Sequence, residues 1–240
     1  MKSLRVVLMS AIVMMSGLLV NAQTADEIIA KHVAAIGGKD AIKAIKTVYV
    51  EYDMEVQGQV GQGVSYLVTG KGYRNEVDFG GQKLIQVFTD KGGWAINPFV
   101  GQTSAEPLPE EELKGNKGNL SPGGPLVDYA AIGGKVELAG TENVNGVAAH
   151  KLKLTIPEGP TVTYLIDPNT FYILKQINTR SFQGSQVDVT STFSDYKKNE
   201  SGLVSPGSTE VEFPGFSFSI KPKKAEYNKE IDPKIFEMQK

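Results

Sequence analysis

The chain contains no cysteine among its 240 residues, and this absence excludes several classes of protein at once. It rules out disulfide frameworks, zinc sites with thiolate ligands, catalytic thiols and a lipid-modified N-terminal cysteine. Histidine is scarce as well, with only two residues. The functions that remain open are those that need neither thiol chemistry nor a histidine-rich metal centre.

The two histidines give little support for catalysis. His32 falls near the apolar stripe of a predicted helix, and His150 falls in a predicted strand. Neither belongs to an H-E-x-x-H motif, no serine stands in a G-x-S-x-G elbow, and no glycine-rich segment matches a phosphate-binding loop. We therefore predict a protein that is not an enzyme, with no catalytic residue, no metal ligand and no cofactor. A hydrolase with an unusual site is the remaining enzymatic alternative.

Long hydrophobic runs are absent after the N-terminus. Lys2 and Arg5 precede an apolar run over residues 6–20, and small residues follow as far as Ala22. This pattern predicts a secretory signal peptide over residues 1–22, cleaved near Ala22-Gln23. The run is shorter than the roughly 20 apolar residues that a spanning helix needs. We expect an exported protein without a lipid anchor.

The charge of the chain gives no reason to expect a nucleic-acid partner. Loss of the two basic residues of the signal peptide leaves 23 basic and 27 acidic side chains, a formal net charge of −4. Nucleic-acid-binding proteins usually carry a basic patch or stripe. The short basic run over residues 221–224 is interpreted as part of an edge strand, where Lys and Pro block aggregation between sheets. Contact with anionic lipid head groups is the alternative.

The mature chain begins with helical patterns and then changes period. Thr24 and Glu27 form a capping box for a helix that Gly37-Gly38 ends, and residues 40–46 predict a second short helix. From Val48 to Val56 every second residue is apolar, which predicts a half-buried strand. Similar runs occur at 63–69, 73–79, 83–89, 92–97, 135–139, 148–156, 161–166, 171–179, 186–195, 208–213 and 216–227. About eleven or twelve antiparallel strands are expected, in a sandwich or a curled half-barrel.

Residues 101–134 interrupt the strands with several prolines and glycines, and we expect no strand there. Two short helical pieces, 109–114 and 126–132, fit inside this insertion. A loop of this length within a compact β domain is usually functional or mobile. No repeat or linker divides the remainder, so residues 23–240 are predicted to form one domain.

The strands share an extensive dry face that few helices can cover. Its apolar positions include Val50, Tyr52, Met54, Leu152, Leu154, Val189 and Phe193. Such a sheet must curl to bury its own face or leave an apolar cavity. A cavity could hold acyl chains, since each buried CH₂ contributes about 0.8 kcal/mol. The pattern alone does not decide between a cavity and a filled core.

Several motifs resemble LolA, the periplasmic carrier of outer-membrane lipoproteins. The segment Gly-Trp-Ala-Ile-Asn-Pro-Phe-Val-Gly-Gln over residues 93–102 resembles the strand end after which that family enters its helical insertion. Residues 124–129, 164–167 and 193–196 resemble a branch of lipoprotein-sorting proteins. The order of leader, helix, strands, insertion and further strands is also similar.

The resemblance implies a mainly β, unclosed antiparallel half-barrel of about 11 strands, with an N-terminal helix and a short helical lid over an apolar cavity. It places Trp94, Pro98 and Phe99 near the cavity and its lid, and it makes Leu126 and Tyr129 lid residues. The family latches its lid with an arginine in a Lys-Arg-Pro context. Here Gly70 stands at that place and Arg74 lies four residues further on, so the resemblance does not extend to the latch.

The resemblance also implies a function and partners. The expected protein is a monomeric periplasmic carrier and chaperone that binds acyl chains of a lipid or lipoprotein and shuttles them towards the outer membrane. Its partners would be a donor complex at the inner membrane and an acceptor at the outer membrane. The alternative is a non-catalytic envelope module that binds another protein and has a filled β-sandwich core.

Overall fold

The computed structural model describes residues 23–110, 112–113, 117–157, 159–182 and 185–238, so the predicted signal peptide lies outside the described residues. Its strands are β1 (Thr47–Val56), β2 (Gln59–Val68), β3 (Gly72–Phe79), β4 (Gln82–Thr89), β5 (Gly93–Asn97), β6 (Gln102–Pro107), β7 (Lys135–Val144), β8 (Val147–Thr155), β9 (Thr161–Ile166), β10 (Ile173–Phe182), β11 (Ser185–Ser194), β12 (Lys197–Lys198), β13 (Val204–Ser205), β14 (Ser208–Phe213) and β15 (Phe216–Tyr227). The helices are α1 (Ala25–Ala35), α2 (Lys39–Lys43) and α4 (Gly124–Val127), with short 3₁₀ turns η1 (Pro98–Val100), η2 (Lys117–Leu120), η3 (Tyr129–Ile132) and η4 (Pro233–Phe236).

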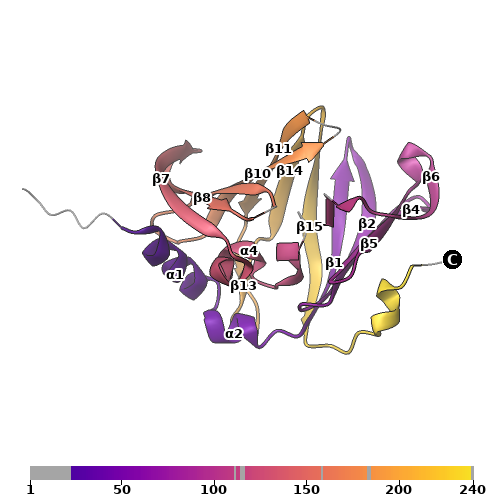
Figure 1. Ribbon diagram of the computed structural model, residues 1–240, viewed down its shortest axis with the longest axis horizontal. Helices are drawn as coiled ribbons and strands as arrows, with labels where there is room; N and C mark the ends of the chain where they lie inside the picture. Colours follow the sequence, from indigo (N-terminus) through magenta and orange to yellow (C-terminus); the bar gives the residue numbers. More distant parts are fainter. Residues whose placement is uncertain (1–22, 111, 114–116, 158, 183–184, 239–240) are drawn as a thin grey trace, which may run out of the picture.

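Thirteen of the strands form one antiparallel sheet in the order β6-β5-β4-β3-β2-β1-β15-β14-β11-β10-β9-β8-β7. β6 and β7 are its two edges, so the sheet does not close, and β12 and β13 form a separate small ribbon. Figure 1 shows α1, α2 and α4 lying against the part of the sheet that contains β7 and β8. The predicted mainly β, unclosed antiparallel architecture is confirmed.

The helices define an inner face of the sheet. On that face Leu152, Leu154, Val162, Tyr164 and Ile166 form one buried core with apolar residues of the three helices. Residues directly opposite one another on paired strands share a face. One inner row can therefore be followed across the sheet through Tyr164, Gln176, Ser191, Val211, Phe218 and Val56. The outer face carries smaller clusters, one around Trp94 and one around Leu165.

The first helix forms for the local reasons that the sequence indicates. The Thr24 hydroxyl accepts a hydrogen bond from the backbone N–H of Glu27 at 3.2 Å, and the Glu27 carboxylate accepts one from the backbone N–H of Thr24 at 2.9 Å. This capping box satisfies two donors that the helix itself leaves free. Ile28, Ile29 and Val33 form an apolar stripe along α1 that is buried in the inner core.

The insertion contains a strand, contrary to the sequence prediction. β6 pairs with β5 as an edge strand, and Pro107 is its last residue, opposite Trp94. A proline at the end of an edge strand removes no ladder hydrogen bond, so the prolines of this segment do not exclude a strand. Part of the predicted helix at 109–114 lies outside the described residues.

The basic run at 221–224 does not form an edge strand, and that prediction is wrong. β15 lies near the middle of the sheet, between β1 and β14. The register shifts so that Glu51 faces Lys224 while Tyr52 faces Pro222, which leaves Lys223 as an extra residue in a bulge. A bulge tolerates the missing N–H of proline. Lys223 reaches the Asp53 carboxylate at 2.7 Å, so the lysines balance the carboxylates of β1 on the outer face.

Two aromatic rings lie flat on glycines of β2. A Cβ on Gly63 would come within 2.2 Å of the Tyr52 ring, and one on Gly61 within 2.7 Å of the Phe79 ring. The Tyr52 hydroxyl donates to Asn75 Oδ1 of β3 at 2.5 Å, so the ring bridges three strands. Glycine is therefore needed here because the rings occupy the space of its side chain.

His32 is a buried titratable group on α1. It is 3% exposed, and its Nδ1–H donates to the Phe171 carbonyl at 2.8 Å. Burial lowers the pKa of His32 below its ordinary value of 6.5, and the hydrogen bond to Phe171 opposes that shift only partly. The folded chain therefore holds this histidine neutral.

We predict that this histidine makes stability depend on pH. Its folded pKa is below its unfolded pKa, so its contribution is present above about pH 6.5 and is lost as the pH falls through that value. The free energy of unfolding, from urea titrations at pH 7.5 and 5.5, should decrease on acidification. In His32→Asn, whose amide can still donate to Phe171, the decrease should be smaller. An equal decrease in both proteins would contradict this assignment.

We also predict that Gly63→Val destabilises the fold by about 1–3 kcal/mol, because the new side chain overlaps the Tyr52 ring. The free energy of unfolding measures the effect. The same substitution in a Tyr52→Ala background should cost clearly less, since the overlapping ring is gone. Equal costs in the two backgrounds would show that the ring is not the cause.

Candidate functional site

The inner face is only partly covered beyond the helices. On β1, Val50 and Met54 are half-buried, and on the neighbouring β15, Phe218 and Ile220 are half-buried. Ala225, opposite Val50, is exposed. An apolar strand face that solvent still reaches, beside a core that is fully buried, is the candidate site. We call these residues of β1 and β15, with the facing residues of β14 and β11, the inner wall.

The structure brings five predicted site residues together on this wall. Val50, Tyr52 and Met54 come from β1, and Val189 and Phe193 come from β11, two strands beyond β15. Val189 is buried and Phe193 is half-buried. On the same face β15 and β14 place Ile220 and Val211 between them, so the surface across the four strands is mainly apolar, with Thr209 and Ser191 as polar interruptions.

Leu152 and Leu154 lie on the same face but in a different setting. Both are fully buried on β8, in the core that α1 and α4 cover. Leu126 of α4 belongs to this core as well and is also buried. These three residues form the packed part of the inner face, next to the inner wall.

The insertion is fastened to the helices through polar contacts. Tyr129, which packs against the same core, donates from its hydroxyl to Asp26 of α1 at 2.5 Å. The Lys39 ammonium lies 3.7 Å from the Asp128 carboxylate. At the other end of the insertion, a Cβ on Gly93 would meet Leu108 and Leu113, so the insertion also covers the inner face of β5.

Pro98 and Phe99 form η1 at the end of β5. The Phe99 ring contacts the edge of the Phe79 ring, with 5.8 Å between the centroids, and is largely exposed. These residues therefore lie at the rim of the inner face, near the turn between β3 and β4.

Trp94 lies on the other face of the sheet from Tyr52 and Met54. It is opposite Val87 on the outer face, and its indole N–H donates to the Phe236 carbonyl at 3.0 Å. Arg74 lies over the indole ring and donates to the Ile235 carbonyl at 2.6 Å. Arg74 thus holds the C-terminal segment η4, not the insertion. The sequence analysis did not single out this segment.

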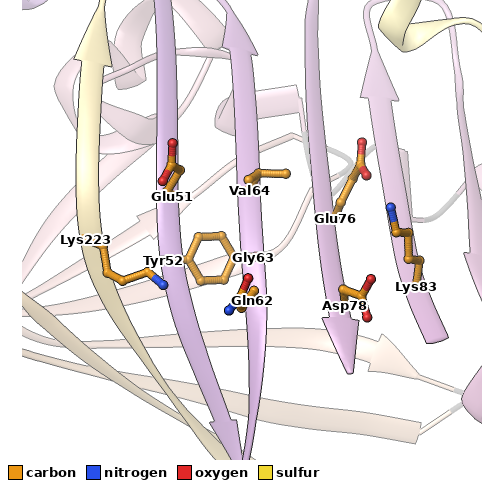
Figure 2. Close-up of a pocket in the computed structure, with 9 residues that line it drawn as sticks. All are labelled: Glu51, Tyr52, Gln62, Gly63, Val64, Glu76, Asp78, Lys83 and Lys223. Carbon is orange, nitrogen blue, oxygen red and sulfur yellow. The ribbon is translucent and has the colours of Figure 1, made fainter. Parts of the chain in front are cut away.

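Figure 2 shows a hollow of about 230 Å³ on the outer face, between the middle strands. It is lined by Glu51, Tyr52, Gln62, Gly63, Val64, Glu76, Asp78, Lys83 and Lys223. Five of these nine side chains carry charges, so a hydrocarbon chain bound in the hollow would lie beside charged groups. The apolar inner wall and the polar hollow are separated by the sheet itself.

The inner face also contains two buried polar atoms without a partner. The Tyr164 hydroxyl on β9 and Asn178 Oδ1 on β10 make no hydrogen bond. They belong to the same face, since Tyr164 lies opposite Gln176, two residues before Asn178. Burial raises the pKa of Tyr164, which keeps its hydroxyl protonated. An unsatisfied buried polar atom costs about 1–3 kcal/mol.

The described residues contain no group of three or more acidic or histidine side chains that could hold a metal ion. No helix among them has both the length and the apolar character to span a membrane.

No protein-family model matches the sequence, and neither does any curated protein. Many solved structures match the chain, and the following three are among those that match most of it. A LolA superfamily protein from Nitrosomonas europaea has a TM-score of 0.58 and 14% identity, with 90% of this chain and 98% of that one covered. A DUF1329 family protein from Desulfovibrio piger has a TM-score of 0.57 and 16% identity, with 90% of this chain and 98% of that one covered.

An outer membrane lipoprotein-sorting protein domain from Vibrio parahaemolyticus has a TM-score of 0.55 and 13% identity, with 88% of this chain and 94% of that one covered. Identities this low establish the fold and nothing finer. The chain therefore has a LolA-like fold.

Proposed function

We propose that this chain is a non-enzymatic carrier that binds acyl chains of a lipid or lipoprotein against its inner wall. The observation that carries the proposal is the mainly apolar surface from Met54 to Phe193, which α1, α2 and α4 leave partly exposed. Water contact with such a surface is unfavourable, by about 25 cal/mol per Å². A hydrocarbon chain would cover it without needing directional contacts.

The same geometry suggests how the site opens. The insertion is tied to the helices by the Tyr129–Asp26 hydrogen bond and the Lys39–Asp128 ion pair, both in exposed positions. Exposed polar contacts contribute about 1 kcal/mol or less each, so they can break and reform readily. Movement of the insertion with respect to α1 would widen access to the inner wall, and it would also withdraw Leu126 of α4 from the core around Leu152.

The finer parts of the proposal follow from the predicted export signal and from the names of the structural neighbours. The carrier would work in the periplasm as a monomer, accept its cargo from an inner-membrane complex and deliver it towards the outer membrane. Two of the neighbours are named as a LolA superfamily protein and a lipoprotein-sorting domain. These names support a role in lipoprotein transport.

An envelope module that binds another protein remains the second candidate. The observation that favours it is the dense core around Leu152, Leu154 and Tyr164, which already fills the helix-covered part of the inner face. Residues 221–224 would not offer such a partner a free strand edge, because they lie in a central strand. This candidate requires that the inner wall bind no hydrocarbon.

We predict that the chain, purified without its signal peptide under native conditions, takes up one or more acyl chains. Native mass spectrometry and lipid extraction should find bound lipid, and a soluble fluorescent fatty acid should be taken up by delipidated protein. Protein that is purified empty and refuses the fluorescent fatty acid would contradict the proposal and favour the protein-binding module.

A matched pair of substitutions tests which face binds. Met54 points into the inner wall opposite Ile220, whereas Glu55 points to the outer face opposite Ser219. Met54→Glu should weaken uptake of the fluorescent fatty acid about tenfold or more, because it places a charge on the apolar wall. Glu55→Gln should leave uptake unchanged. Equal effects would mean that the ligand does not bind at the inner wall.

A further inference from the structure

One end of the sheet gathers several turns. β1 and β2, β3 and β4, and β14 and β15 are joined by tight turns at 57–58, 80–81 and 214–215. The pairing of Val56 with Phe218 and of Gln62 with Asp78 brings these turns to the same end, and η1 follows β5 there. In Figure 1 the β1–β2 and β14–β15 turns lie at the top, away from α1 and α2. We call these turns with η1 the apolar end.

The apolar end exposes large hydrophobic side chains. Seven such side chains are strongly exposed among the described residues, and four of them lie here. They are Val60 at 60%, Phe99 at 52%, Val100 at 74% and Phe216 at 48% exposure. Isolated exposed apolar residues are ordinary on protein surfaces, but these four share one end of the sheet, in a row that extends from β15 to the end of β5, and such a row indicates an interaction site.

Further aromatic rings support these exposed residues from behind. The rings of Phe213 and Phe216 are stacked with 4.8 Å between centroids, and the Phe218 ring lies beside both. Phe79 supports Phe99 in the same way. The side chains at the turns are thus held outward by packed neighbours, so they are presented to solvent in a fixed arrangement.

The turn segments of the apolar end contain no charged residue, although two carboxylates border them: Glu55 lies opposite Val60, and Asp78 accepts a hydrogen bond from the Gly81 N–H at 2.6 Å. The segments 56–62, 79–82, 97–105 and 213–219 contain no Asp, Glu, Lys or Arg, although 22% of all residues in the chain are charged. Their polar residues are Gln, Ser, Thr and Asn, with several Gly and Pro. A contact made by this end would therefore depend on apolar burial and would have little electrostatic component.

We propose that the apolar end docks on the surface of a lipid bilayer, with the side chains of Val60, Phe99, Val100 and Phe216 inserted among the lipids. The end consists of separate turns with small apolar tips, which suits the fluid interface of a bilayer, where no matched surface is needed. The absence of charge from the turn segments fits a neutral membrane surface.

The apolar end is also continuous with the inner wall. Val56 is paired with Phe218 at the turns, and Met54 is paired with Ile220 one step further along the same face. Docking would bring the entrance of the wall against the lipids, so that an acyl chain could pass between them without crossing water. In this respect the inference deepens the proposed function and rests on it, whereas the docking itself can be measured separately.

The test is flotation of the chain, without its signal peptide, with vesicles of neutral phosphatidylcholine. A substantial fraction should float with the vesicles, and that fraction should change little between about 0.1 M and 1 M salt, where exposed charges become screened. The triple variant Phe99→Ser, Val100→Ser, Phe216→Ser should lose vesicle binding by about tenfold or more, because it removes most of the inserted apolar surface.

A matched control removes exposed apolar side chains elsewhere. The triple variant Ile132→Ser, Leu138→Ser, Met238→Ser replaces the other three strongly exposed residues, none of which belongs to the apolar end. It should bind vesicles as the parent protein does. Thermal unfolding of both triple variants verifies that each remains folded.

Several outcomes would overturn the inference. They are failure of the parent protein to float, binding only to anionic vesicles with loss at high salt, equal losses in the two triple variants, or dimerisation that buries the same residues. Uptake of a soluble fluorescent fatty acid is measured in parallel. Normal uptake without vesicle binding refutes the docking alone, whereas vesicle binding without uptake refutes the carrier function and leaves the docking in place.

Discussion

The structure depends on how a thirteen-stranded open sheet covers its inner face with very few helices. α1, α2 and α4 are short, and they bury mainly the part of that face formed by β8 and β9. Over β2, the rings of Tyr52 and Phe79 lie flat on glycines and provide local cover. Between these two regions the wall formed by β1, β15, β14 and β11 stays partly open. The helix-covered core on one side and the aromatic rings over β2 on the other thus bound the candidate site.

The outer face is stabilised by different interactions. Carboxylates of β1 meet lysines of β15, and Arg74 is paired with Glu76 at 2.6 Å while it lies over Trp94. Ion pairs between exposed side chains contribute little individually, but they allow this face to remain in water. The sheet therefore separates a mainly apolar inner face from an outer face on which ion pairs surround two small apolar clusters, and alternation along the strands produces both.

Local sequence patterns predicted the helices and strands well. They did not predict which strands pair when these lie far apart in the chain. The capping box at Thr24 and the alternation from Val48 to Val56 depend on neighbouring residues, so the sequence contains the whole signal. The central position of β15 and the bulge at Pro222 depend on a partner strand about 170 residues away in the chain. The family resemblance placed Trp94 near the cavity, whereas the structure places it on the outer face. Its strand has only five residues, and the alternation of Trp94 with Gly93 and Ala95 does not show which face of the sheet is the inner one.

The attachment of the C-terminal segment has a spectroscopic consequence. Trp94 is the single tryptophan of the chain, and Phe236 and Arg74 cover its ring. When the excitation wavelength is long enough to excite tryptophan selectively, the intrinsic fluorescence comes from Trp94 alone. It therefore reports on the contact between the sheet and residues 233–236. Release of that segment would shift the emission to the red, whereas occupation of the opposite side of the sheet would leave the spectrum nearly unaltered. The emission of Trp94 thus distinguishes the state in which residues 233–236 contact the sheet from the state in which they do not.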